Sequence, residues 1–463
     1  MKIIVKKSLM VFLFVIYYSF FHLLIFGALV FKVYQPMPTD IHYDVSTFKT
    51  GSSDVQYAYL MEARRLSFDI RLALIEAAEE TIDISYYAVH NDQSKNIFYG
   101  ALLKAADRGV KIQFIIDGFI EGGVLSDAQA VHTLNAHPNI TVRYYEPIKW
   151  FQIHHMQNRL HDKLIIVDTH YGIIGGRNIG DRYYSETTAL ANQTFDKDVL
   201  IFGVEPIQAV LDMQVYFEEL FDSEFSFDTG TLSAEEALKI KLIDEYEVYI
   251  FDTDLVTIHE EMLDAAIEVE QITFLRSPLN RMHKEPVIFK ALVELSKDYD
   301  TLYIQSPYFI LNRPLSAIFS DFEIKNTTIL TNSIHTNPNV LAVAGYLNIR
   351  NQLASEANLY EYQQPMSLHA KTFLFGEDIT VIGSLNIDPR SAFLSTESVV
   401  IIYSEAFNLH TKSVMDAYIT DSLRVLSDGT YQEGTIDATT SSQARKLILW
   451  ILKPLGAFFD DLL

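Results

Sequence analysis

Two segments of this sequence carry the same polar pattern at a constant distance along the chain. The matched residues are His161, Lys163 and Asn178 in the first segment and His369, Lys371 and Asn386 in the second. The offset is 208 residues at all three positions, and each histidine precedes its asparagine by 17 residues. Agreement of three polar positions within matching hydrophobic frames is improbable by chance, so the pattern predicts a chain built from two related halves.

Helix and strand patterns around each copy predict the fold class. In the first half, helix patterns at residues 72–78 and 97–107 alternate with strand patterns at residues 81–87 and 110–117. The second half repeats this order from residue 287. Helices that connect consecutive strands are typical of βαβ units. The sequence therefore predicts an α/β fold with two pseudo-symmetric βαβ domains, whose sheets are mixed and mostly parallel.

Composition and pattern divide the chain into five parts. The predicted parts are an N-terminal signal anchor (1–32), a membrane-proximal connector (33–63), a first α/β domain (64–232), a charged, helix-prone junction (233–268) and a second α/β domain (269–463). The second domain ends in an amphipathic segment from Lys446 to Phe459, in which Pro454 is expected to break the helix. This segment fits a membrane-surface helix and a core-packing terminal helix equally well.

The N-terminal segment predicts a membrane location. Ser8 to Phe31 is a stretch of 24 residues without Asp, Glu, Lys or Arg, and Lys2, Lys6 and Lys7 precede it. Such a stretch spans a bilayer and exceeds the apolar region of a cleaved signal peptide. Because lysines favour the cytoplasmic side, we expect a single-pass transmembrane helix in the cell membrane, with the catalytic part of the chain extracytoplasmic.

Charge and cysteine content exclude several other classes of protein. The net charge of −24, from 36 Lys and Arg against 60 Asp and Glu, opposes general binding to nucleic acid, which depends largely on cations that contact phosphates. No nucleic-acid partner is therefore expected, and binding to anionic lipid must be confined to a local site. The absence of cysteine excludes a disulfide framework, a thiolate nucleophile and a cysteine metal site.

The His-x-Lys pairs are suited to phosphodiester chemistry. A strand alternates its side chains, so His and Lys two residues apart point to the same face, and a pseudo-two-fold axis brings two of each together. Lysine stabilises charge on the non-bridging oxygens, while one neutral histidine attacks phosphorus and the other protonates the leaving alcohol. Water then gives hydrolysis, whereas a second alcohol gives transfer. Asn178 and Asn386 are placed to donate further hydrogen bonds to phosphate, Tyr308 and Phe309 are candidates to line the cleft, and no metal or cofactor is required.

Each histidine also needs a hydrogen-bond acceptor on its other ring nitrogen. In the second half, Glu397 precedes a strand and lies 28 residues after His369. In the first half, Asp196 precedes the comparable strand, with Asp198 as a neighbouring alternative. Asp168, which follows an apolar strand, is interpreted as a strand-end hydrogen-bonding residue more than as a catalyst.

These residues resemble the phospholipase D superfamily, whose signature His-x-Lys-x4-Asp occurs twice in one chain. The first copy is complete through Asp168, whereas the second has Gly376 in place of the aspartate. The resemblance extends from about residue 64 to the C-terminus and is strongest for the bacterial cardiolipin synthase branch. The phrases that carry it are residues 101–110, 175–181, 306–309, 330–333 and 383–391.

The resemblance implies a phosphatidyltransferase that forms cardiolipin from phosphatidylglycerol through a phosphatidyl-histidine. By analogy, His161 is the nucleophile and His369 is the general acid and base, although the sequence does not separate the two roles. The implied partners are a membrane and its phospholipids, with phosphatidylglycerol as donor and phosphatidylethanolamine or another alcohol left open as acceptor. The alternatives are a membrane-anchored phospholipase D-type hydrolase and a phosphodiesterase or nuclease.

Overall fold

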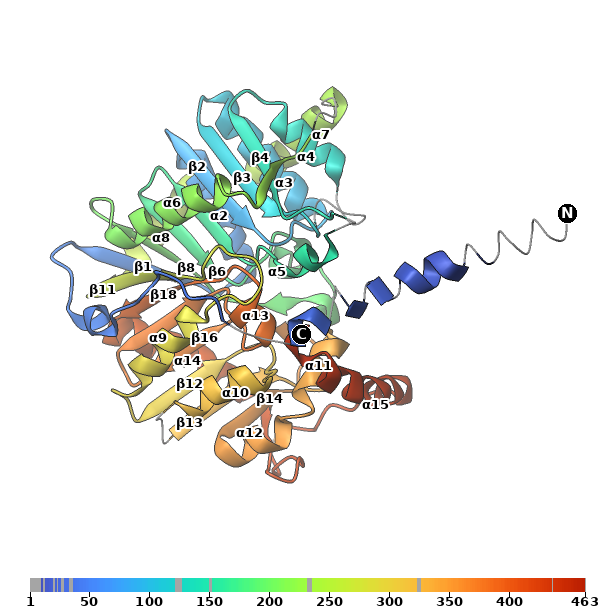
Figure 1. The fold of residues 1–463 in the computed structure, drawn as a ribbon. Helices are drawn as coiled ribbons and strands as arrows, with labels where there is room; N and C mark the ends of the chain where they lie inside the picture. The colour runs from blue at the N-terminus through green and yellow to red at the C-terminus, as the bar shows by residue number, and fades with distance from the viewer. Residues whose placement is uncertain are drawn as a thin grey trace, which may run out of the picture.

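The two halves of the chain form two mixed β-sheets, which appear as two stacked lobes in the computed structural model (Figure 1). The structure describes residues 10, 13–19, 21–22, 24–25, 29–32, 36–120, 127–149, 152–230, 235–322, 326–434 and 436–462, with the backbone alone at 153 and 154. Helices cover the outer faces of both lobes, and the described N-terminal residues project away from the body.

Strand order is the same in the two sheets, except that β10 is an additional edge strand of the first sheet. The first sheet runs β10-β1-β8-β6-β5-β2-β3-β4-β9 and the second runs β11-β18-β17-β16-β12-β13-β14-β19. The strands of the first sheet are β1 (Gln56–Met61), β2 (Thr81–Tyr86), β3 (Lys111–Asp117), β4 (Ile140–Tyr145), β5 (Lys163–Val167), β6 (Tyr171–Gly175), β8 (Asp198–Gly203), β9 (Ser226–Asp228) and β10 (Ile267–Val269). Those of the second are β11 (Gln271–Arg276), β12 (Thr301–Gln305), β13 (Asn326–Asn332), β14 (Asn358–Tyr362), β16 (Thr372–Phe375), β17 (Ile379–Gly383), β18 (Ser398–Tyr403) and β19 (Ser422–Arg424).

The helices are also divided between the lobes. The first lobe contains α2 (Arg64–Ala77), α3 (Gln93–Asp107), α4 (Ala128–Asn135), α5 (Asp181–Tyr184), α6 (Gln208–Phe221), α7 (Glu236–Phe251) and α8 (Leu255–Ala265). The second contains α9 (Val287–Ser296), α10 (Arg313–Ser320), α11 (Val340–Tyr346), α12 (Arg350–Glu356), α13 (Pro389–Phe393), α14 (Glu405–Ile419) and α15 (Gln443–Phe458). Short 3₁₀ helices are η1 (Leu29–Lys32), η2 (Val45–Lys49), η3 (Ile153–Gln157), η4 (Leu190–Asn192) and η5 (Asp460–Leu462).

The sheets are mixed, as predicted, but the prediction that they are mostly parallel is wrong. In each sheet only the run β2-β3-β4 or β12-β13-β14 is parallel, and the other neighbouring pairs are antiparallel. The His-x-Lys strands β5 and β16 continue through short turns into β6 and β17, so no helical crossover reverses the direction of the chain there. Parallel βαβ units are therefore confined to the first part of each half.

The lobe boundaries also differ from the predicted divisions. β1, from the predicted connector 33–63, pairs with β8 inside the first sheet. The predicted junction 233–268 supplies α7, which packs on α3, and α8, which packs on α2. Its last residues form β10, which pairs with β1 at the sheet edge. The junction and β1 therefore belong to the first lobe, whereas Phe48 and its apolar neighbours in the connector pack in the core of the second lobe.

A shared apolar core joins the two lobes. Ile166 and Val199 of the first sheet belong to the same buried cluster as Ile382 and Val400 of the second. Each of these side chains is 1% exposed or less. Because both faces of these central strands are covered, they are continuously apolar, and this explains the hydrophobic frames around the two His-x-Lys pairs.

The N-terminal η1 and the C-terminal η5 lie in contact, and Lys32 of η1 forms ion pairs with Asp460 and Asp461 of η5. Among the described residues, no helix is both long enough and apolar enough to span a membrane. The predicted anchor, Ser8 to Phe31, includes residues outside the described part, namely 8, 9, 11, 12, 20, 23 and 26–28. At the other end, α15 continues through Pro454 to Phe458, so the expected helix break is wrong. One missing backbone hydrogen bond is tolerated in a helix whose other side packs on α11.

Candidate active site

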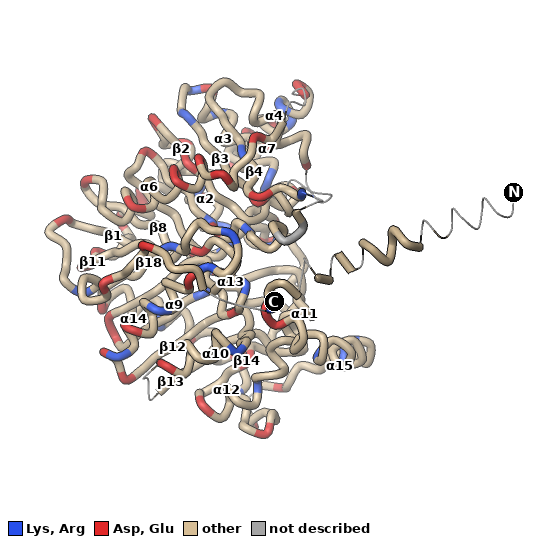
Figure 2. The backbone as a smooth tube through the Cα atoms, viewed as in Figure 1, with Lys and Arg blue, Asp and Glu red and all other residues tan. Residues whose placement is uncertain are grey.

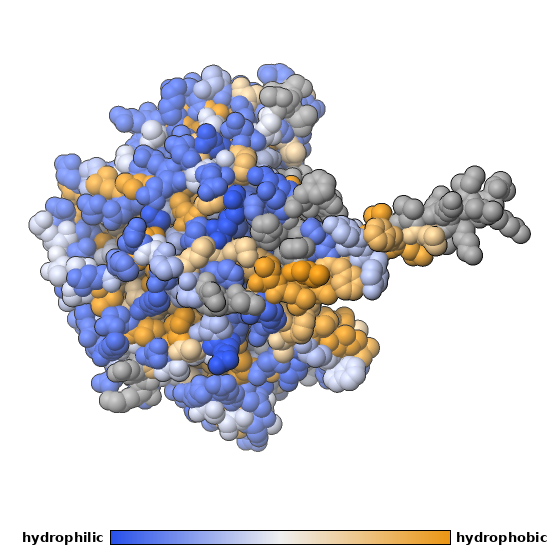
Figure 3. Space-filling view, in the orientation of Figure 1, coloured by the Kyte–Doolittle hydropathy of each residue, from blue (hydrophilic) through white to orange (hydrophobic). Residues whose placement is uncertain are grey.

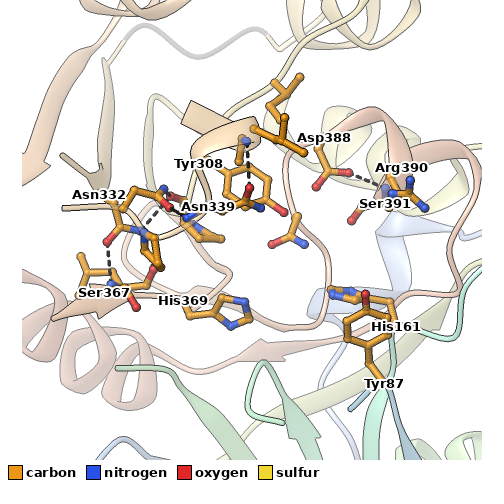
Figure 4. A pocket seen from close by; sticks show the side chains of 18 of the residues that line it. Tyr87, His161, Tyr308, Asn332, Asn339, Ser367, His369, Asp388, Arg390 and Ser391 are labelled. Carbon is orange, nitrogen blue, oxygen red and sulfur yellow. Dashed lines mark hydrogen bonds between the residues drawn. The ribbon is translucent and has the colours of Figure 1, made fainter. Parts of the chain in front are cut away.

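The two His-x-Lys segments meet at the interface of the lobes. Lys163 begins β5, and Lys371 directly precedes β16, so both histidines lie in the extended residues that lead into central strands. The rings of His161 and His369 point into one cavity (Figure 4). The repeat found in the sequence therefore forms a single site and not two separate ones.

Each histidine is held by a carboxylate of the opposite half. His161 Nδ1 lies 3.0 Å from Glu397 Oε2 and 2.9 Å from Oε1. His369 Nδ1 lies 2.6 Å from Asp196 Oδ2. Both carboxylates were predicted from the sequence, but each was paired there with the histidine of its own half. The structure exchanges the partners.

Strand pairing between the lobes explains this exchange. The short strands β7 (Thr194–Phe195) and β15 (Ser367–Leu368) pair in parallel across the interface, and the N–H of His369 donates to the carbonyl of Phe195 at 2.7 Å. On the other side of the pseudo-two-fold axis, the N–H of Thr396 donates to the Arg159 carbonyl at 2.8 Å. These contacts align the chain before each histidine with the chain before the other half's carboxylate. The side chains that follow therefore meet across the interface.

The two lysines lie beneath the imidazoles and are almost fully buried. Lys163 Nζ donates to the carbonyl of His161 at 2.5 Å. Lys371 Nζ donates to the carbonyl of His369 and lies 2.8 Å from Nδ1 and 3.4 Å from Nε2 of that ring. Each lysine is 1% exposed. Both cations are thus fixed close to the place where a phosphate can contact both histidines.

Burial and the lysine charges set the protonation of the histidines. Burial, reinforced by Lys163 and Lys371, holds the pKa of His161 well below its ordinary value. Burial and the adjacent Lys371 lower the pKa of His369 to about 3. Both imidazoles are therefore neutral at neutral pH in the free protein, which is the form that a nucleophile needs.

The two carboxylates are not equivalent in their electrostatic environment. Burial raises the pKa of Glu397 to about 8, against the opposing charge of Lys163. Burial also acts to raise the pKa of Asp196, but Lys371 and His369 outweigh it and hold that pKa below its ordinary value. The site thus combines one firmly ionised carboxylate with one that takes up a proton more readily.

The two asparagines of the repeat lie close to the site. Asn386 lines the cavity, and the Asn178 side-chain amide donates to the Tyr183 hydroxyl at 3.2 Å. In the part of the chain that the structure describes, the Oδ1 atoms of Asn178 and Asn386 are buried without a hydrogen-bond partner. An amide oxygen accepts hydrogen bonds, so these two atoms are open to a donor such as a substrate hydroxyl, and only the side-chain NH₂ groups can donate to a phosphate.

The cavity above the histidines measures about 360 Å³ and is lined from both lobes. Its charged wall includes Arg159, Arg182 and Arg390, together with Asp388, whereas the other charged residues of both signs are spread over the helices and loops of both lobes (Figure 2). The arginines were not predicted from the sequence. Arg182 and Arg390 are also 208 residues apart, so extension of the repeat comparison beyond the asparagines would have identified them.

Aromatic residues complete the wall of the cavity. Tyr87 and Tyr308 line it, and the Tyr87 ring lies 5.1 Å from that of His161. The prediction for Tyr308 is confirmed. Phe309 instead belongs to the buried core of the second lobe, because adjacent residues of an extended segment point in opposite directions.

Asp168 lies at the end of β5 remote from His161 and does not line the cavity. Its carboxylate accepts hydrogen bonds from the backbone N–H groups of Glu79, Glu80 and Thr81, each at 2.8 Å. The structure therefore gives Asp168 the strand-end bonding role and contradicts its inclusion among the catalytic candidates.

Gly376 occupies the equivalent turn of the second lobe. Its φ is 54° and that of Asp168 is 51°, and the N–H of each bonds to the first residue of the neighbouring strand, Thr301 or Thr81. A Cβ at Gly376 would lie 2.6 Å from the Tyr299 ring. The tyrosine thus fills the space that an aspartate would need, and the departure from the repeat affects this turn and not the histidine site.

The fold and site define the class of protein: two His-x-Lys segments around one cavity in one chain make an enzyme of the phospholipase D superfamily. The family model described as "Cardiolipin synthase, PLD-like domain" matches residues 72–220 and 292–419, and the chain belongs to this family. It is accordingly a phosphatidyltransferase-type enzyme of that superfamily.

Individual relatives agree with this assignment. An uncharacterized protein of Helicobacter pylori is 29% identical over 380 residues, which cover 73% of this chain and 74% of the relative. Cardiolipin synthase C of Escherichia coli is 28% identical over 391 residues, which cover 73% of this chain and 80% of the relative. The crystal structure of phosphatidylserine synthase from Haemophilus influenzae shares the fold, with a TM-score of 0.63 at 12% identity, over 90% of this chain and 100% of that one.

Proposed function

We propose that this enzyme forms cardiolipin by transfer of a phosphatidyl group from one phosphatidylglycerol to another. The observation that carries the proposal is the exchange of carboxylates between the halves, His161 with Glu397 and His369 with Asp196, around one cationic cavity. This arrangement presents two oriented imidazoles to one phosphorus atom, as a double displacement requires.

The first displacement forms a covalent intermediate. The ring nitrogen Nε2 of His161 attacks phosphorus, a P–N bond forms, and the bond from phosphorus to the headgroup glycerol oxygen breaks. His369, protonated on substrate binding, donates its proton to that oxygen, and glycerol leaves. Lys163 and Lys371 stabilise the negative charge on the non-bridging oxygens.

The second displacement restores the free enzyme. A headgroup hydroxyl of the second phosphatidylglycerol gives its proton to His369, its oxygen attacks phosphorus, and the P–N bond breaks to release His161. The number of phosphodiester bonds is unchanged, so no external energy source is needed. The division of roles between the histidines follows the family resemblance, because both imidazoles are neutral in the free protein.

The cation content of the cavity favours anionic lipids as both substrates. Arg182 and Arg390 line the cavity together with Arg159, which is paired with Asp117 at 2.9 Å, and with Asp388, so the cations of the wall outnumber its acidic residues. A second anionic phospholipid offsets this charge, whereas phosphatidylethanolamine brings no net charge. Phosphatidylethanolamine also has an amine and no free hydroxyl in its headgroup, so its role in this reaction is that of a second-ranked phosphatidyl donor, from which ethanolamine leaves.

The proposed location is the cell membrane, with one N-terminal anchor and the catalytic lobes outside the cytoplasm. Support comes from the 24-residue stretch without charged residues and from the lysines before it. Among its described residues, Phe14 and Tyr17 are 68% and 65% exposed. A reporter enzyme fused after Leu463 tests the orientation, and activity restricted to the cytoplasm would contradict it.

The function is tested by incubation of purified protein in detergent with radiolabelled phosphatidylglycerol. We expect cardiolipin and glycerol in equal amounts. Phosphatidic acid without cardiolipin would indicate hydrolysis, and cleavage of DNA without lipid turnover would indicate a nuclease. Phosphatidylethanolamine labelled in its phosphatidyl group tests the second donor, because its use with unlabelled phosphatidylglycerol gives labelled cardiolipin and ethanolamine.

A further inference from the structure

Helix α15 has two apolar faces, and only one of them is packed against protein. On the inner face, Leu449 is 7% exposed, and α15 contacts α11. Gly456 lets the helices approach closely, because a Cβ there would lie 3.0 Å from the backbone of Ala344 and Gly345. The inner face therefore anchors α15 to the second lobe.

The outer face of α15 should be polar in a helix that faces only water. It instead carries large exposed apolar side chains: Leu447 (58%), Ile448 (46%), Trp450 (76%), Ile451 (50%), Leu455 (46%) and Phe458 (50%). At 100° per residue these positions occupy the side of the helix opposite Leu449 and Gly456. We call this set the outer face of α15, and such a contiguous apolar surface is typical of an interaction site.

The charge of α15 identifies the chemistry of its partner. The helix contains Arg445, Lys446 and Lys453 and no Asp or Glu, whereas the whole chain has a net charge of −24. Lys446 and Lys453 are exposed and lie along one flank of the outer face. An apolar stripe with lysines at its edge and an exposed tryptophan matches the boundary between anionic headgroups and acyl chains.

The C-terminal end of α15 leads directly into the wall of the active site. The segment η5, which follows α15, places Leu462 in the wall of the cavity, and Arg390 holds the Leu462 carbonyl at 2.7 Å. Leu341 of α11 is 48% exposed and lines the same cavity. Lys32, at the end of the N-terminal segment, forms ion pairs with Asp460 at 2.8 Å and Asp461 at 3.0 Å.

These contacts bring three features to one side of the molecule: the end of the N-terminal segment, the cavity mouth and α15. Figure 3 shows apolar residues gathered over the region where η1 and α15 lie, beside the projecting N-terminal segment. A flat partner that covers the outer face of α15 would therefore also face the cavity. A phospholipid bilayer has this shape and, when anionic, the complementary charge.

We propose that the outer face of α15 binds the surface of a bilayer containing anionic phospholipid and holds the cavity mouth against it. Lipids then reach His161 and His369 from the membrane without full exposure of their acyl chains to water. The role of this contact in delivering lipid substrate rests on the proposed function. The contact between α15 and the bilayer can itself be measured without turnover.

Tryptophan fluorescence of the full-length protein tests the contact directly. The chain contains two tryptophans, so Trp150→Phe leaves Trp450 as the only emitter. After reconstitution into phosphatidylglycerol-containing vesicles, we expect a blue-shifted Trp450 emission. Lipids brominated near the carboxyl end of the acyl chains should quench it more strongly than lipids brominated near the methyl end. The same experiment on the His161→Ala background separates failure of binding from failure of the proposed function.

Substitutions provide the matched control. Leu447→Glu with Ile451→Glu should lower turnover of vesicle phosphatidylglycerol by roughly tenfold or more and leave turnover of a dispersed short-chain phosphatidylglycerol unchanged. Val248→Glu changes a residue of α7 that is 74% exposed on the other lobe, and it should affect neither substrate. Equal loss on both substrates would indicate a folding defect and overturn the evidence for docking.

Two other outcomes would also overturn the proposal. Trp450 emission that is unchanged by vesicles and unquenched by either brominated lipid, in protein that is reconstituted and active, would show that α15 stays in water. A blue shift that depends on protein concentration in the absence of lipid, together with a dimer in light scattering, would show that a second copy of the chain covers the outer face.

Discussion

Glu397 of the second half lies 3.0 Å from Nδ1 of His161 in the first half, although 236 residues separate them in the sequence. The reciprocal contact joins His369 to Asp196. Neither half therefore contains a complete histidine site. The reactive groups form a complete active site only when the two lobes are packed together.

The exchange of partners predicts selective effects on the two histidines. Glu397→Gln should alter the ¹⁵N chemical shifts and tautomer of His161 and leave those of His369 unchanged, because only His161 loses its carboxyl partner. Asp196→Asn should do the opposite. Each substitution should lower turnover by roughly 10- to 100-fold. Histidine NMR spectra assigned by comparison with His161→Ala and His369→Ala check this, and a response from the own-half histidine would contradict the structure.

The covalent mechanism predicts that either histidine is indispensable. His161→Ala and His369→Ala should each lower turnover by more than about 10³-fold without unfolding, since both displacement steps use both side chains. In protein quenched with labelled lipid, the phosphatidyl adduct should map to His161 by mass spectrometry. An adduct on His369 would reverse the assigned roles, and full activity of either variant would contradict a shared site.

The pH dependence of kcat/KM should follow the protonation of Lys163. Burial, together with Lys371, lowers the pKa of Lys163 to about 7. Above that pH the lysine loses its proton and its attraction for phosphate, so kcat/KM should fall as the pH rises through about 7. Bound phosphate favours the charged lysine, so kcat should fall only at higher pH. Lys163→Arg should remove the decline in kcat/KM while lowering the maximum rate, and an unchanged decline would assign it to another group.

Substitution of Asp168 should lower the free energy of unfolding and leave kcat unchanged. Asp168→Ala removes three hydrogen bonds to a charged acceptor and places alanine at a positive φ, so the free energy of unfolding should fall by about 1–3 kcal/mol. Asp168→Gly should cost less, because glycine tolerates this turn as Gly376 does. Chemical denaturation measures both effects. The kcat of the folded fraction should equal that of the unmodified enzyme, and a loss of kcat would restore a catalytic role.

At the equivalent turn of the second lobe, the opposite substitution introduces an aspartate in place of Gly376. Gly376→Asp restores the aspartate of the repeat but places its Cβ against the Tyr299 ring. We expect destabilisation of about 1–3 kcal/mol, in contrast to what the sequence pattern alone would suggest. Combination with Tyr299→Ala should recover part of the loss by making space for the side chain. Stabilisation by Gly376→Asp alone would show that the space is available.

The repeat at an offset of 208 residues determined the main outline of the protein. It predicted two related lobes, the His-x-Lys pairs and the asparagines beside them, whereas Asp196 and Glu397, which are 201 residues apart, were predicted from their positions just before strands. These features depend on local patterns, because alternation along a strand fixes which side chains share a face. The same reasoning overestimated the parallel pairing, since the order of elements along the chain does not show which strands become neighbours.

The tertiary structure decided which residues act together. The partners of His161 and His369, the arginines of the cavity and the position of α15 beside its mouth all depend on contacts between segments far apart in the chain. The pairing of β7 with β15 across the lobes has no signal within either segment alone. Packing of two apolar sheets fixes that register, and it turns two incomplete halves into one site.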